Sequence, residues 1–365
     1  MPAGRAVAVR INVRHSLFFR QLQAAICGGM IAAAPLPLAA QTPATDWQAA
    51  LDSGSPRLML FALQIEKPQG ADDFVARLQY GQAMQQTKAA PPVMLSYRAN
   101  LRPIVAYDGN INSGAPGDGY YIGDILFHNE DPDARAKAGM VFGGEASLTV
   151  RFAIAPGRTL DLTAYGTQAH SFDYGLDVLN AGLSACGAQY LGRTSWAEIC
   201  LGDTFSQRDN APERERFASI GISKVFASRF GFHEARATVQ TSQRKDYDKT
   251  SLSLQLITAK AGLGALTLRI DASERIPGYN TRLFGTSAAL TRPIAGVSTT
   301  LFAGYGVEAG GAIFGQPRRD EVFSIGLSRK LTSHAEASLR LSQRQSTIPA
   351  YDGVSVDLDV ALIDF

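Results

Sequence analysis

Residues 251–271 read SLSLQLITAKAGLGALTLRID, and this stretch decides the fold. Leu252, Leu254 and Leu256 alternate with polar residues before Gly262-Leu263-Gly264. The second half alternates in the same way, with apolar Leu266, Leu268 and Ile270 between Thr267, Arg269 and Asp271. Successive side chains of a strand point to opposite faces, so each half predicts a strand with one apolar and one polar face. The glycine-rich turn predicts that the two strands form an antiparallel hairpin.

The same alternation recurs from Val93 to the last residue and predicts about fourteen strands. Many of them are near the ~9–11 residues that cross a bilayer at a tilt. Two- or three-residue turns alternate with longer polar connections, notably 108–138 and 309–320. We expect the strands near 93–107, 139–155, 159–171, 176–191, 194–207, 217–228, 231–245, 250–262, 265–276, 281–293, 297–308, 321–333, 335–347 and 353–364.

This rhythm predicts an all-β protein, an antiparallel up-and-down transmembrane β-barrel of about 14 strands over residues 93–365. A soluble β-sandwich also alternates and is the competing fold. Aromatic residues flank short turns, as Tyr190 and Trp196 do, which favours an interfacial girdle. The chain ends at Phe365 after an alternating strand, and this ending resembles the assembly signal of bacterial outer-membrane proteins. Phe365 has the opposite parity to Val360 and Leu362, so a bulge or a position beyond the bilayer face is expected.

Residues 1–40 predict a secretory signal peptide. Four arginines and no acid lie in residues 1–20, residues 21–40 carry no charge, and small residues precede Gln41. We expect cleavage after Ala40 and export to the outer membrane of a Gram-negative bacterium. Residues 41–92 read instead as a short helical segment, with helices at 46–51, 57–66 and 72–86. This segment is too small for a core of its own, so we expect a periplasmic piece or a plug that leans on the barrel.

Cys186 and Cys200 lie symmetrically about Arg193 in a predicted hairpin turn. Opposed positions of an antiparallel pair bring Cβ atoms to about 4.5–5.5 Å, close to what a disulfide needs. Export to an oxidising compartment makes a structural disulfide the expectation, and two free thiols in another register are the alternative.

The composition excludes several function classes. Lys and Arg number 35 against 33 acids, so no basic excess points to nucleic acid. A mean hydropathy of −0.04 argues against a bundle of membrane-spanning helices. We find no nucleophile elbow, no metal-spaced histidine pair and no phosphate loop, and expect no enzyme, cofactor or metal site. His170, Ser171 and Asp173 lie on one strand, where neighbours face opposite sides and form no triad. The acidic run 128–133 is interpreted as a solvated loop.

Alternate residues of a strand share one face. If the apolar face of each strand contacts lipid, the opposite face places charged side chains in the lumen. A conducting lumen for polar cargo and cross-strand pairs that set the strand register are both open interpretations. Closure would set the last strand between the first and the penultimate one. The predicted lumen charges are Arg98, Arg102, Arg151, Arg236, Arg269, Arg340, Asp357 and Asp359.

Residues 97–112 read YRANLRPIVAYDGNIN, an opening strand that ends in Asp108, Asn110 and Asn112. This element resembles the start of the surface lipoprotein assembly modifier barrel. The family has an outer-membrane barrel of similar strand number after several periplasmic helical repeats, whereas residues 41–90 have room for about one. The resemblance implies a non-catalytic role in moving proteins or lipoproteins to the cell surface. It also implies as partners outer-membrane lipids, the barrel-assembly machinery and client surface lipoproteins.

Two other functions stay open on the sequence. One is a porin-like channel for small polar solutes. The other is a structural or adhesive barrel that acts through the connections 108–138 and 309–320.

Overall fold

A computed structural model places most of the chain. It describes residues 45–85, 92–108, 111–112, 114, 119–122, 125–128, 131, 133, 135–208, 211–313, 315–332, 335–348 and 351–362. The expected signal peptide 1–40 and the terminal Phe365 lie outside these residues.

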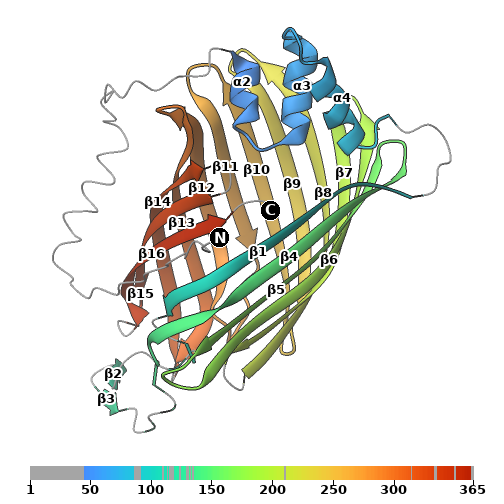
Figure 1. The fold of residues 1–365 in the computed structure, drawn as a ribbon. Coiled ribbons are helices and arrows are strands. Elements are labelled where there is room, and N and C mark those ends of the chain that lie inside the picture. The colour runs from blue at the N-terminus through green and yellow to red at the C-terminus, as the bar shows by residue number, and fades with distance from the viewer. Residues whose placement is uncertain are drawn as a thin grey trace.

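The fold is an all-β, antiparallel, up-and-down barrel, and the strands follow one another round the wall in chain order (Figure 1). Within the described residues one sheet of 14 strands forms this wall, as the sequence predicts. Its strands are β1 (Val93–Asp108), β4 (Gly139–Ala155), β5 (Arg158–Ser171), β6 (Leu176–Gly192), β7 (Ser195–Arg208), β8 (Ala211–Ser228), β9 (Gly231–Gln243), β10 (Asp248–Lys260), β11 (Gly264–Ser273), β12 (Thr281–Ile294), β13 (Val297–Ile313), β14 (Gln316–Thr332), β15 (Ala335–Ser346) and β16 (Gly353–Leu362).

The two faces of the wall differ as the alternation predicts. Leu183, Leu201 and Ile220 point outward and are 65%, 58% and 63% exposed in the isolated chain. Inward positions on the same strands are polar or small, such as Ser219 and Gly221 on β8. Large apolar side chains that face away from the core are unfavourable in water and favourable in lipid, so the outer surface is that of a transmembrane barrel.

The two ends of the barrel are built differently. At one end, called here the short-turn end, consecutive strands are joined by only two or three residues. At the other, called the far end, the 108–139 connection carries a separate hairpin of β2 (Gly119–Ile122) and β3 (Ile125–His128). One prediction there is wrong: 309–320 is no long loop. β13 continues to Ile313 and β14 already begins at Gln316, because Ala312 still pairs with Pro317 beyond a bulge.

Two further strand predictions need correction. β8 begins at Ala211 rather than at 217, since Pro212 to Arg216 still pair with β7. The predicted insertion of the last strand between the first and the penultimate one is only partly realised. β16 pairs with β15, but the sheet order ends at β1 and β16, and no ladder joins their described residues although their backbones approach each other.

Three helices precede the barrel and lie at the short-turn end (Figure 1). They are α2 (Asp46–Leu51), α3 (Pro56–Glu66) and α4 (Asp72–Gly81). Thr45 caps α2 in a capping box, and Ser55 caps α3 with Pro56 at its first position. The predicted third helix ends five residues early, because Ala83 has a φ of 55° and leaves the helical conformation. No helix among the described residues is long and apolar enough to span a membrane.

Candidate functional site

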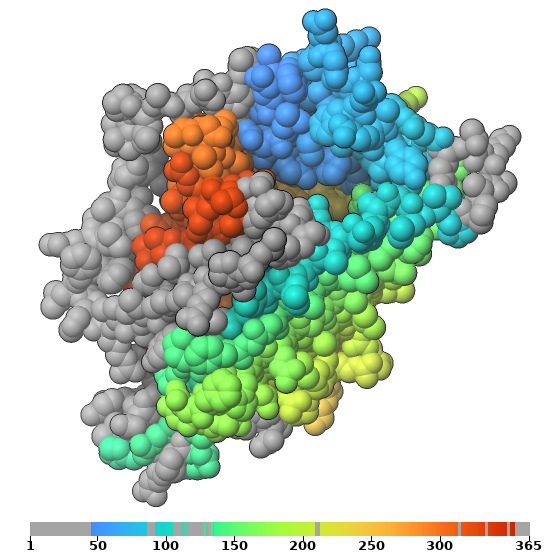
Figure 2. All heavy atoms as spheres, in the orientation of Figure 1, coloured from blue at the N-terminus to red at the C-terminus, as the bar shows by residue number. Residues whose placement is uncertain are grey.

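The helices dock on the inner wall of the barrel at the short-turn end. Leu58 and Ala62 of α3 are fully buried against Val225 and Phe232, which point inward from β8 and β9. Phe61 packs edge-on against Phe232, with 5.8 Å between ring centroids. In the space-filling view the helices cover this end of the molecule (Figure 2). The apolar stripe of α3 is therefore buried by the barrel and not by a helical domain of its own.

Arg57 of α3 is the centre of a polar contact between the helices and the wall. Its Nη2 lies 2.6 Å from Glu198 Oε1, its Nη1 donates to Ser223 Oγ at 2.7 Å, and its guanidinium lies 4.9 Å from the centroid of the Trp196 ring. Arg236 also donates to Glu198. The side chains of Arg57 and Glu198 are each only 16% exposed. Charged pairs removed from water are weakly screened, so this contact holds α3 in one orientation.

Two hydrogen bonds fix the rest of the segment, and a third residue, Asp52, is affected by burial against the barrel. Asp46 of α2 accepts the backbone N–H of Ala261 at 2.6 Å. The carbonyl of Ala83, just after α4, accepts the N–H of Gly157 at 2.8 Å. Burial raises the pKa of Asp52 at the end of α2, and the Lys330 ammonium partly offsets that rise. The helices thus meet several sectors of the barrel mouth and not one strand pair.

A cavity of about 630 Å³ lies between the helices and the wall. Arg57 and Gln82 line it from the helical side, and Arg151, Asp161 and Arg236 from the wall. Arg151 and Asp161 sit directly opposite on β4 and β5 and form two hydrogen bonds, of 2.7 and 2.6 Å. The space exists because the inward positions beside them are small. Ala188, Ser219 and Gly221 are among these small residues.

A second charged network lies in the lumen toward the far end. Asp320 of β14 is fully buried and accepts from Arg318 and Arg344, each at 2.5 Å, and from Ser346 at 2.6 Å. Arg344 also lies 2.8 Å from Glu308. These residues come from adjacent strands, so the network ties β13, β14 and β15 together.

The predicted lumen charges fall into four groups. Arg151 and Arg236 line the cavity, as described. Arg269 pairs with Asp271 on its own strand at 2.9 Å, and Arg340 lies over the inward Phe302 ring. For the last strand the ladder sets Asp357 opposite Arg340 and Asp359 opposite Ser338. Arg98 and Arg102 lie on β1, on the inward parity.

The disulfide residues lie where the hairpin geometry predicts. Cys186 and Cys200 are partners in the β6–β7 register, and a disulfide joins them. Both face inward and line the cavity.

The sequence element that carries the family resemblance lies at the far end. Asp108 ends β1, and Asn110 falls outside the described residues. Asn112 organises the connection: its amide donates to the carbonyls of Asp133 and Arg135, and its Oδ1 accepts from Gly114 and Lys137. His170 pairs with Asp177 of the next strand at 2.9 Å. The described residues contain no group of three or more His, Cys, Asp or Glu able to hold a metal ion.

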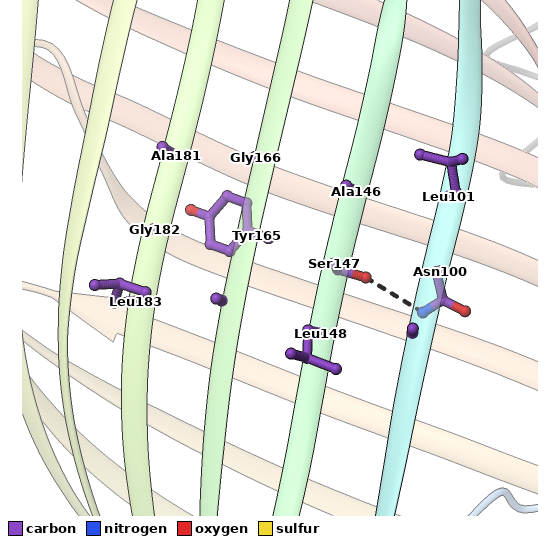
Figure 3. A pocket seen from close by; sticks show the side chains of 12 residues that line it. Asn100, Leu101, Ala146, Ser147, Leu148, Tyr165, Gly166, Ala181, Gly182 and Leu183 are labelled. Atoms are coloured by element: carbon purple, nitrogen blue, oxygen red, sulfur yellow. Dashed lines mark hydrogen bonds between the residues drawn. The ribbon is translucent and has the colours of Figure 1, made fainter.

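A shallow groove on β1, β4, β5 and β6 is of a different kind. Figure 3 shows Leu101, Leu148 and Leu183 on separate strands around small residues, with Asn100 donating to Ser147 at 3.3 Å. Small residues such as Ala146 and Ala181 thin the outward face there. The leucines belong to the apolar outer band, so the groove is part of the lipid-facing surface.

Sequence reasoning missed the residues that join the helices to the barrel. Arg57, Glu198 and Glu234 meet only when the chain folds, and Ser55 bonds to Glu234 across 179 positions of sequence. One signal was available: Glu198 and Glu234 have the inward parity of their strands. Arg57, their partner in α3, lies in a helical segment, where the sequence pattern does not predict a contact with the barrel wall.

Comparison with known proteins gives little beyond distant likeness. No family model matches the chain, and no curated protein matches it. Among solved structures it is similar to OpdO of Pseudomonas aeruginosa, at 9% identity and a TM-score of 0.39 over 74% of this chain and 97% of that one. It is similar to OccAB3 of Acinetobacter baumannii, at 8% identity and a TM-score of 0.38, over 74% of this chain and 100% of that one. It is also similar to the outer membrane protein OpdK of P. aeruginosa, at 8% identity and a TM-score of 0.35, over 74% of this chain and 99% of that one.

Proposed function

We propose that this chain is an outer-membrane channel for small polar solutes, with residues 41–92 acting as a plug. The observation that carries the proposal is the docking of α3 on the inner wall through Arg57, inside a barrel whose lumen is lined by charged and polar side chains. A barrel of about fourteen strands is wider than the eight-stranded barrels that side chains fill. Its lumen therefore holds water, a plug or both.

The orientation follows from the two ends. Outer-membrane barrels have short periplasmic turns and longer outside loops. On that rule the short-turn end and its helices face the periplasm, after export by the 1–40 signal peptide. The barrel-assembly machinery would insert residues 93–365, with outer-membrane lipids around the apolar band. The helices then narrow the periplasmic mouth, and polar solutes pass when the Arg57 contact releases.

The family resemblance implies another function, the movement of lipoproteins to the surface. In that case the helices would receive a client. In the structure the apolar residues of α3, Leu58 and Leu63, are already buried, which leaves that face unavailable while it is docked. The adhesive alternative now rests on the 108–138 connection alone, because 309–320 is a hairpin and not a loop.

Single-channel conductance in a planar bilayer tests the proposal. We compare purified residues 41–365 with the Arg57→Ala variant, after both show heat-modifiable migration on a gel. The expected result is a small or intermittent conductance for the unmodified chain and a larger, steadier one for Arg57→Ala. Folded protein that conducts in neither form would overturn the channel and revive the client-transfer function. A large steady conductance in the unmodified chain would overturn the plug.

A further inference from the structure

Two arginines lie on the outer surface of the wall, near the turn that joins β12 to β13 at the short-turn end. The register sets Arg292 of β12 opposite Thr299 of β13, and Thr299 opposite Arg329 of β14. Two residues closer to the middle of the barrel, Leu301 of β13 pairs with Leu327 of β14, and these outward leucines are 48% and 38% exposed. Residues two apart on a strand share a face, as do cross-strand partners, so both arginines belong to the lipid-facing surface.

The two arginines share one patch, and no acid balances their charge. Nη2 of Arg329 donates to the carbonyl of Ile294 at 3.5 Å, and Ile294 lies two residues from Arg292 on the same strand. Arg329 therefore reaches across β13 toward the strand that carries Arg292. Neither arginine forms an ion pair with an acidic side chain of the described residues. Their strands lie one strand apart, which puts the two backbones about 10 Å from each other, so one small anion can meet both long side chains.

Outward cations at the far end have acidic partners instead. Asp203 of β7 pairs there with Arg214 and, at 3.6 Å, with Arg216. Arg319 of β14 lies 3.2 Å from Glu321 on its own strand. The chain thus neutralises the arginines at one rim of its outer surface with its own carboxylates. At the other rim the two arginines of β12 and β14 depend on an anion from outside the chain.

The surroundings of the two arginines favour a lipid as the source of that anion. Guanidinium groups bind phosphate through paired N–H bonds, and basic residues at a membrane surface are attracted to anionic lipids. A soluble phosphate would contact the arginines alone. A lipid phosphate at the same place would also bring acyl chains against Leu301 and Leu327, which lie on the membrane side of the two charges.

We propose that Arg292 and Arg329 bind the headgroup phosphate of an anionic glycerophospholipid, whose acyl chains run along Leu301 and Leu327. The bound lipid neutralises the two charges and holds the β12–β13 turn at the level of the headgroups. The site lies on the outer surface, apart from the cavity and the lumen. It therefore stands or falls independently of the proposed channel.

Native mass spectrometry of residues 41–365 in detergent micelles measures this binding directly. We titrate the protein with phosphatidylglycerol and with phosphatidylcholine of identical acyl chains. Both headgroups carry the phosphate, but the choline cation cancels its charge. The expected result is that the first phosphatidylglycerol binds on the order of tenfold more tightly than the first phosphatidylcholine. Equal affinity for the two lipids would overturn the proposal.

Two double variants of equal charge change localise the site, each checked for heat-modifiable migration. The Arg292→Gln/Arg329→Gln protein should bind phosphatidylglycerol no more tightly than phosphatidylcholine. The Arg214→Gln/Arg216→Gln protein is the matched control, because it also loses two outward arginines, from the far end. This control should keep the preference. A preference that survives in the first variant, or is lost equally in both, would contradict the assigned contacts.

A competition experiment on the unmodified chain separates a lipid site from a site for soluble phosphates. Glycerol 3-phosphate carries the phosphate without acyl chains. At a concentration equal to that of the lipid it should leave phosphatidylglycerol bound, because it gains nothing from the leucines. Displacement of the lipid under these conditions would overturn the lipid as the occupant.

Discussion

Arg57 Nη2 of helix α3 lies 2.6 Å from Glu198 Oε1 of strand β7, and this pair joins the helical segment to the barrel. The same guanidinium donates to Ser223 on the next strand. The helix therefore touches two strands of the wall through one side chain. Its position depends on a polar contact as well as on the buried Leu58 and the half-buried Phe61.

Arg57→Ala should loosen the helices without unfolding the barrel. Loss of hydrogen bonds to a charged group costs about 1.5–3 kcal/mol, and Glu198 keeps Arg236 as a partner. Chymotrypsin should cleave the 45–85 segment faster in the variant, while heat-modifiable migration is retained. Arg77→Ala is the matched control, because Arg77 stacks on Phe74 of its own helix. Equal cleavage of both variants would contradict the role of Arg57.

The disulfide should stabilise the barrel. Cys186 and Cys200 close a loop with a sequence separation of 14 residues, and a bridge of this kind contributes about 2–4 kcal/mol. The Cys186→Ala/Cys200→Ala protein should unfold at a lower urea concentration, as followed by tryptophan fluorescence. The unmodified chain in reductant should match it. If reductant leaves the unmodified midpoint unchanged, the two thiols are not bridged in solution.

Position parity predicts opposite outcomes for two arginine substitutions. Ile220 of β8 points outward and is 63% exposed, so Ile220→Arg places a charge against lipid and should cost about 2–4 kcal/mol. Gln240 of β9 pairs with Ser219, the residue before Ile220, and both of these side chains point inward. Gln240→Arg should fold with nearly unchanged stability, because its charge reaches the lumen. The check is the urea midpoint in lipid vesicles, and a reversed order would exclude this assignment of the two faces.

Asp320 should be the most sensitive carboxylate of the far-end network. It is fully buried and accepts from Arg318, Arg344 and Ser346, so Asp320→Ala removes the acceptor of Arg318 and leaves Arg344 with Glu308 alone. Removing one partner of a buried pair costs about 3–5 kcal/mol. Glu321→Ala, next in sequence, removes an outward carboxylate whose partner Arg319 is 58% exposed, and should cost less than about 1 kcal/mol. Equilibrium unfolding in urea compares the two variants.

Asn112→Ala should loosen the far-end connection alone. The side chain bonds four backbone groups between Gly114 and Lys137, each worth about 1 kcal/mol. Proteolysis within 109–138 should accelerate in the variant while the barrel keeps its heat-modifiable migration. Asp131→Ala removes a bond to its near neighbour Asp133 and should have a smaller effect. Unfolding of the whole barrel in Asn112→Ala would mean that the residue holds more than this connection.

Local pattern was sufficient for most of the wall. Alternation over ten residues placed the strands and their inward faces, because a strand's side-chain period is a property of its own backbone. It put Arg151 and Arg236 on the inward face, and turn symmetry put Cys186 opposite Cys200. The errors fell at strand ends. There the polar residues near 309–320 read as loop, although pairing with a neighbouring strand extended both β13 and β14.

The sequence by itself determined the class of fold, the outward and inward residues, the turns and the facing cysteines, since each depends on residues close along the chain. Only the tertiary structure decided that α3 packs inside the barrel mouth, that Arg57 meets Glu198, and that a cavity lies between the helices and the wall. Those contacts join segments far apart in sequence, and their energies depend on burial and geometry that arise only after the barrel and the helices have packed together.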